Sequence, residues 1–150
     1  MAGTMTSDGI SGEDWDRIRA LAVDVVNASA VGEDLAERTR LFEALDGLER
    51  KYGRLPSILA TRGDFAESTN ERVTCLLDGF ALATERSDRS NQLFIADSLA
   101  RTYIQDLCDV DRGRQWLDVL AGCLRQGGGE SDINDYEALE EAWTRLRNRG

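Results

Sequence analysis

The side chains best suited to chemistry in this chain are two clusters of acidic and amide residues. They are Asp106, Asp109 and Asp111 in the first cluster, and Asp132, Asn134, Asp135 and Glu137 in the second. Grouped oxygen ligands of this kind could hold a hard cation such as Ca²⁺. The second cluster, however, lacks the central Gly and the spaced terminal Glu of a calcium-binding loop. Helix capping and solvated turns account for both clusters better, so we expect no metal site.

The groups on which most enzymes rely are absent. The chain has no His, the commonest general base and metal ligand. Its three cysteines, Cys75, Cys108 and Cys123, form no CxxC pair. None of the motifs GxGxxG, GxxxxGK[ST] and GxSxG occurs. We therefore expect a non-enzymatic protein with no catalytic residues and no cofactor, the alternative being an enzyme that works through carboxylates alone.

The charge balance is strongly acidic, with 28 Asp and Glu residues against 18 Lys and Arg residues and a net charge of −10. Nucleic-acid phosphates would be repelled by such a surface, so we expect no nucleic-acid partner. A basic protein would be attracted and steered toward it. The competing interpretation is that the acidity serves solubility alone.

Several features indicate where the protein resides. No apolar run is long enough to cross a bilayer, and the N-terminal residues lack the pattern of a secretory signal. An odd number of irregularly spaced cysteines, three in all, suits a reducing environment. Arg supplies nearly all the positive charge, Lys51 being the one lysine. We therefore expect a cytoplasmic protein without a membrane partner, and the Arg bias is typical of a GC-rich bacterial genome.

Apolar residues recur every three or four positions through most of the chain, which predicts α-helices. The clearest pair covers residues 90–126, where two apolar stripes meet at a turn around Cys108. Pro56 suits the first turn of a short helix, and Ser68 begins a capping-box pattern. In the second predicted helix the residues expected to face inward are Leu35, Thr39, Phe42, Leu45, Leu48 and Tyr52.

The organisation of the chain follows from these segments. No stretch shows the sustained alternation of a strand, so the sequence predicts an all-α fold of about seven helices packed as antiparallel hairpins. We expect a flexible leader over residues 1–10 and a single α-helical domain over residues 11–150. The last helix is expected over about 132–148, after a flexible hinge at Gly127–Gly129.

The helix pair over residues 90–126 resembles a tetratricopeptide repeat. The residues that carry the resemblance are Leu99, Ala100 and Tyr103 on the first helix, and Gly113 and Trp116-Leu117 on the second. A weaker copy, with its turn at residues 62–65, precedes this pair. The pattern departs from the family in two ways, because the turn at Cys108 comes one residue late and Pro56 shortens the first helix of the earlier copy. The resemblance implies a right-handed helical array with a protein-binding surface.

Two functions fit these observations. The first is a small acidic binding protein that blocks a protein partner, as a bacterial immunity or antitoxin protein blocks a basic toxin. The second is a repeat-type adaptor or secretion chaperone that holds an extended peptide of a secreted effector. The sequence does not determine the oligomeric state.

Candidate partner-binding residues lie on the polar faces of the predicted helices. The set consists of Asn91, Phe94, Asp97, Ser98, Arg101, Asp106, Asp109, Glu137, Glu140 and Glu141. The first five would line a peptide groove, and the acids among the whole set would attract a basic partner.

Overall fold

The computed structural model describes residues 3–149, which form helices and the loops between them, without a strand. The α-helices in this range are α1 (Gly12–Ser29), α2 (Leu35–Tyr52), α3 (Pro56–Asp64), α4 (Thr69–Glu85), α5 (Arg89–Arg101), α6 (Val110–Gly127) and α7 (Glu130–Arg149). A five-residue π-helix, η1 (Thr102–Asp106), lies between α5 and α6. The prediction of an all-α fold with about seven helices is confirmed.

Local sequence explains where the helices begin. The Ser68 hydroxyl accepts a hydrogen bond from the backbone N–H of Glu71 at 3.1 Å, as the capping-box pattern predicts. Pro56 occupies the first turn of α3, where its missing N–H costs no intrahelical hydrogen bond. The Asp109 carboxylate caps α6 by accepting from the N–H of Arg112 at 3.0 Å.

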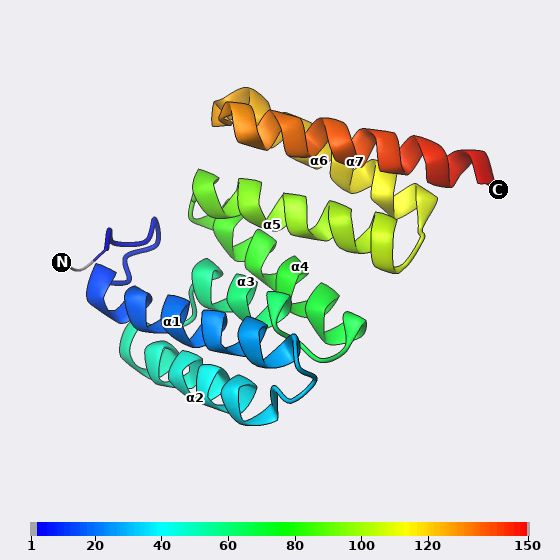
Figure 1. The fold of residues 1–150 in the computed structure, drawn as a ribbon. Coiled ribbons are helices and arrows are strands. Elements are labelled where there is room, and N and C mark those ends of the chain that lie inside the picture. The colour runs from blue at the N-terminus through cyan, green and yellow to red at the C-terminus, as the bar shows by residue number, and fades with distance from the viewer. Residues whose placement is uncertain (1–2, 150) are drawn as a thin grey trace.

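The helices are stacked in chain order, from α1 and α2 at one end to α6 and α7 at the other (Figure 1). Successive helices pack against each other and run in alternating directions, so that neighbours form antiparallel hairpins. Contacts also join α3 with α5 and α5 with α7. The α5–α6 hairpin, which carries the resemblance to a tetratricopeptide repeat, is the most extensive of these pairings.

The buried apolar side chains of residues 3–149 form two clusters. One joins α1, α2 and α3 and includes Leu41, Leu45 and Ile58. The other joins α3 to α7 and includes Leu99 and Leu117. Each fully buried aliphatic side chain of this size contributes roughly 1.5–3 kcal/mol to stability. Because α3 supplies residues to both clusters, it connects the two halves of the molecule.

Residues 3–10 are packed against the helices, which differs from the flexible leader predicted for residues 1–10. The Ile10 side chain is fully buried in the cluster that joins α1, α2 and α3. The Asp8 carboxylate accepts hydrogen bonds from the backbone N–H of Ser57 at 2.7 Å and from its hydroxyl at 2.9 Å. The buried Ile10 side chain and the hydrogen-bonded Asp8 carboxylate thus order a segment whose composition alone indicated flexibility. The first two residues lie outside the described range.

The buried face of α2 is rotated from the predicted one. Leu45 and Leu48 are buried as predicted, but Leu35 is 71% exposed and Thr39 is exposed as well. The buried stripe instead starts at Leu41, which has no exposed surface. The helix carries two apolar stripes, and packing against α1 covers the one that contains Leu41. The other stripe is left facing α4.

Candidate functional site

Asn91, predicted to line a peptide groove, is a buried structural residue. Its side chain is 8% exposed, and its amide donates to the Asp88 carboxylate at 2.7 Å and lies 3.2 Å from the Ser57 hydroxyl. The Ser7 hydroxyl donates to the same Asp88 carboxylate at 2.7 Å. Asn91 therefore belongs to a polar cluster that joins the N-terminal segment to α3 and α5. We call it the N-terminal polar cluster; it consists of Ser7, Asp8, Ser57, Asp88 and Asn91.

The other predicted residues of α5 are accessible to solvent. Phe94 is 51% exposed, and Arg101 is exposed too. Asp97 and Ser98 are partly buried, and the Asp97 carboxylate pairs with the Arg101 guanidinium at 2.9 Å. These four residues thus stay available to a partner.

Most of the predicted acids have structural roles. Asp106 pairs with Arg72 at 3.2 Å, and Asp109 caps α6. Glu140 accepts two hydrogen bonds from Arg114, at 2.8 and 3.1 Å, and this arrangement lowers the pKa of Glu140. Among the described residues, the two predicted acids that are exposed and lack an ion-pair partner are Glu137 and Glu141.

The structure does not gather the ten predicted residues into one site. A groove of about 510 Å³ between α5, α6 and α7 includes Phe94 and Asp97 among the ten. Its other lining residues are Arg89, Ser90, Leu93, Leu120, Gly127, Asp132 and Asp135. Its lining contains more acids than bases, and the remaining predicted residues lie outside it.

One acid of each acidic cluster caps a helix, in line with the capping interpretation of these clusters. Asp109 caps α6, and the Asp132 carboxylate accepts from the Gly129 N–H at 2.9 Å at the start of α7. Between residues 3 and 149, no group of three or more Cys, Asp or Glu side chains is arranged to hold a metal ion.

Asp64, at the end of α3, is the carboxyl with the most unusual environment. Its pKa is raised to about 6, mainly by burial and to a smaller extent by nearby Asp97, while the Arg72 guanidinium and the Ser98 hydroxyl act in the opposite direction. Because the folded-state pKa exceeds the ordinary value of 3.8, the folded protein binds this proton more tightly than the unfolded chain does. The stability contributed by the protonated acid is present at low pH and is lost as the pH rises from about 4 to about 6.

We therefore expect Asp64→Asn to stabilise the protein by about 1–2 kcal/mol at pH 7 and to leave it nearly unchanged at pH 4. The full pKa shift corresponds to roughly 3 kcal/mol, and partial exposure of the carboxyl reduces it. Urea unfolding of both proteins at several pH values measures the difference. Equal free energies of unfolding at pH 7 would contradict the proposed burial of a charged carboxylate.

A second groove lies between α2 and the start of α4. It consists of two adjoining pockets of about 320 and 410 Å³ that share Phe42 and Glu71, and we call it the α2–α4 groove. Its lining residues are Leu35, Arg38, Thr39, Phe42, Glu43, Asp46, Arg62, Ala66, Glu67, Asn70, Glu71, Thr74 and Cys75. Phe42 is half-buried at the centre, next to the exposed Leu35.

Electrostatics make this groove acidic. Both of its arginines are neutralised by neighbours, since Arg38 pairs with Asp34 at 2.8 Å and Arg62 pairs with Asp46 at 2.6 Å. Three further acids of the lining, Glu43, Glu67 and Glu71, have no ion-pair partner in the described part of the chain. The groove therefore presents an apolar floor beneath uncompensated negative charge.

Sequence reasoning missed the α2–α4 groove because it treated the apolar positions of α2 as one buried face. A sharper signal was present. Leu35 and Phe42 are seven residues apart and therefore share one face of the helix. Leu41 and Leu48 are also seven residues apart, but they define a second face, because Leu41 immediately precedes Phe42. Two apolar stripes on one helix indicate that the helix contacts two different surfaces.

None of the helices between residues 3 and 149 combines the length and the apolar character needed to span a bilayer. Comparisons with protein-family models, curated proteins and solved structures find no match to this chain.

Proposed function

We propose that this chain is a non-enzymatic protein-binding module whose α2–α4 groove holds a basic, amphipathic helix of a protein partner. The observation that supports the proposal most directly is the coincidence of an apolar floor and uncompensated acids in one groove. Leu35 and Phe42 supply the floor, and Glu43, Glu67 and Glu71 supply the charge. An amphipathic helix that lays its apolar side chains into a hydrophobic groove is a recurrent mode of recognition.

The two features would act on different steps of binding. Covering Leu35, which is 71% exposed, and the accessible edge of Phe42 would provide most of the affinity, because buried aromatic and aliphatic anchors dominate interface energetics. The acids would attract Lys and Arg side chains that flank the partner's apolar stripe. Such attraction acts mainly on the association rate and is screened over about 8 Å at physiological salt.

Of the two roles expected from the sequence, we propose the first, in which capture blocks the partner as an immunity protein blocks a toxin. A groove that suits a folded amphipathic helix favours binding to a structured protein. The alternative role, holding an extended peptide of a secreted effector, is supported by the separate groove between α5, α6 and α7, which includes Phe94 and Asp97. Loss of the partner's activity on binding would favour the first role, and a partner that stays active or unfolded would favour the second.

The proposal is tested with a partner captured from the native host by the wild-type protein. Glu67→Lys with Glu71→Lys should slow association about tenfold at low salt, and the difference should shrink as salt is raised. Leu35→Ser should accelerate dissociation without changing the melting temperature, because Leu35 is 71% exposed.

The matched control is Glu130→Lys with Glu137→Lys on α7. Glu71 and Glu130 each lie in the first turn of a helix, so both double variants lose a similar interaction with the helix dipole. We expect this control to bind like the parent. Because Glu137 belongs to the set predicted from sequence, a slower control together with unchanged groove variants would move the binding surface to α7 and refute the α2–α4 groove.

A further inference from the structure

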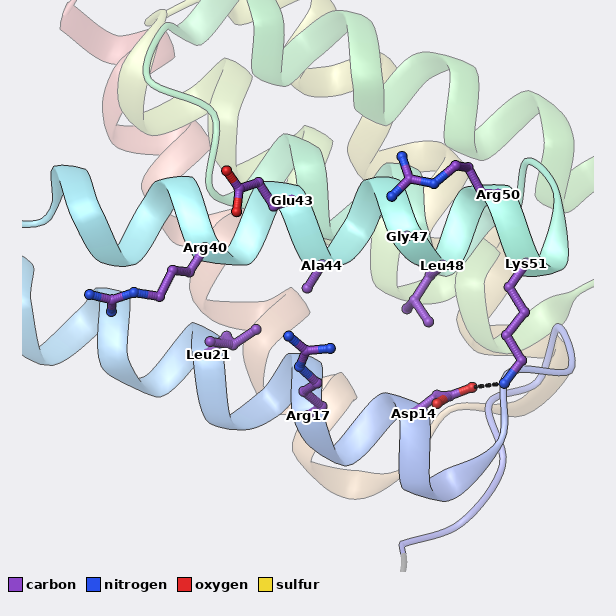
Figure 2. Close-up of a pocket in the computed structure, with 10 residues that line it drawn as sticks. All are labelled: Asp14, Arg17, Leu21, Arg40, Glu43, Ala44, Gly47, Leu48, Arg50 and Lys51. Atoms are coloured by element: carbon purple, nitrogen blue, oxygen red, sulfur yellow. Dashed lines mark hydrogen bonds and ion pairs between the residues drawn. The ribbon is translucent and has the colours of Figure 1, made fainter.

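The seam between α1 and α2 carries a pocket of the opposite charge, which we call the α1–α2 basic pocket. Its volume is about 420 Å³. It is lined by Asp14, Arg17, Leu21, Arg40, Glu43, Ala44, Gly47, Leu48, Arg50 and Lys51 (Figure 2). Arg17 and Leu21 reach it from α1, while Arg40, Ala44 and Leu48 reach it from α2.

The lining of this pocket carries a net positive charge, opposite in sign to the protein as a whole. Lys51 is paired with Asp14 at 2.7 Å, and this contact closes one end of the seam (Figure 2). Arg17, Arg40 and Arg50 have no carboxylate within ion-pair distance in the described part of the chain. The lining thus holds four cationic side chains against two carboxylates, Asp14 and Glu43, in a protein with a net charge of −10.

Gly47 provides an independent observation. It lies inside α2, where a glycine destabilises a helix by roughly 0.5–1 kcal/mol relative to Ala. Packing does not require it, because a Cβ at this position would approach no atom closer than the flexible end of Arg50, at 3.8 Å. Because Gly47 has no side chain, it leaves open space in the lining of the basic pocket.

The chemistry of the lining points to one class of ligand. Guanidinium groups present planar pairs of donors that match phosphate oxygens, and a phosphate monoester carries close to two negative charges at neutral pH. Leu21, Ala44 and Leu48 are partly or fully buried apolar residues beside these groups and would contact an uncharged organic portion. A cavity of about 420 Å³ suits a small molecule rather than a folded partner.

We propose that the α1–α2 basic pocket binds a small phosphorylated organic molecule, with Arg17 or Arg40 on the phosphate and the apolar residues of the seam on the organic part. This site is separate from the α2–α4 groove and does not rest on the proposed partner-binding function. Glu43 borders both surfaces and is therefore left unchanged in the experiments below.

Phenyl phosphate serves as the probe, because it combines a phosphate monoester with an apolar ring. Titration followed by two-dimensional NMR at low salt should saturate, with the largest shifts on residues of α1 and α2. Arg17→Gln with Arg40→Gln should weaken binding about tenfold or more. The control, Arg125→Gln with Arg145→Gln, removes the same charge from exposed positions on α6 and α7 and should bind like the parent. Equal weakening in both double variants would mean unspecific attraction of anions and would overturn the proposal.

A second pair of variants tests the pocket by shape. Gly47→Leu should fill the space and abolish binding while keeping or raising the melting temperature, because it removes a helix-interior glycine. Gly122→Leu makes the same change inside α6, away from the pocket, and should bind phenyl phosphate normally. Retained affinity in a folded Gly47→Leu protein, or inorganic phosphate binding as tightly as phenyl phosphate, would refute the site as described.

Discussion

Gly113→Leu is expected to lower the free energy of unfolding by about 3 kcal/mol, the largest effect that we predict for a single substitution. Gly113 lies in the first turn of α6 and faces Ile104 of η1. A Cβ at this position would lie 2.9 Å from Cγ1 of Ile104 and 3.4 Å from Cδ1 of Trp143. Both neighbours are held by surrounding side chains, so the added leucine would have to push α6 away from the core.

The matched control is Gly122→Leu in the same helix. There the nearest atom to an added Cβ is the mobile end of Arg125, at 3.6 Å, and the chain gains helix propensity. We expect this variant to be as stable as the parent or more stable. Urea unfolding of the three proteins measures the comparison. Gly113→Leu unfolding at the parental urea concentration would mean that α6 and η1 do not approach as closely as described.

Asn91→Ala is expected to cost about 2–3 kcal/mol, because it removes the central donor of the N-terminal polar cluster. Asp88, whose carboxylate accepts from Asn91 at 2.7 Å, is only 8% exposed. A buried carboxylate that loses a donor cannot replace it with bulk water. The loss in free energy of unfolding therefore exceeds the contribution of an ordinary hydrogen bond. The N-terminal segment should also loosen, since the Asn91 amide lies 3.1 Å from the Ser7 hydroxyl.

Two measurements separate these consequences. Urea unfolding gives the loss of stability, with Asn134→Ala on the exposed face of α7 as the control that should stay within about 0.5 kcal/mol of the parent. Hydrogen exchange should show faster exchange at the Ile10 N–H, which donates to Thr6. If both variants resemble the parent in both measurements, the N-terminal segment is not held by this cluster.

The proposed functions and these stability predictions concern different parts of the molecule. Gly113 and Asn91 are buried and lie outside the α2–α4 groove and the α1–α2 basic pocket. Leu35, Glu67 and Arg17 are exposed, so substitutions there should alter binding while the fold is kept. Stability measurements on every binding variant therefore distinguish loss of a site from loss of the fold.

By itself, the sequence determined the fold class and most helix boundaries. Apolar periodicity and capping residues act over three or four positions, so their consequences are visible in a short window of sequence. Ser68 begins the capping box of α4, and Pro56 begins α3, as predicted. Ala100 and Gly113, two of the residues that carry the resemblance to a tetratricopeptide repeat, are both buried.

The tertiary structure decided which faces were covered and which charges were compensated. Leu41 rather than Leu35 became core because α1 packs against only one of the two apolar stripes of α2. Asn91 became a buried donor because residues 3–10 fold back over α3 and α5, a contact between segments more than eighty residues apart. Among the charges, Glu140 pairs with Arg114, whereas Arg17 has no ion-pair partner between residues 3 and 149. Such outcomes depend on distances between segments that lie far apart in the chain, and neither periodicity nor composition records those distances.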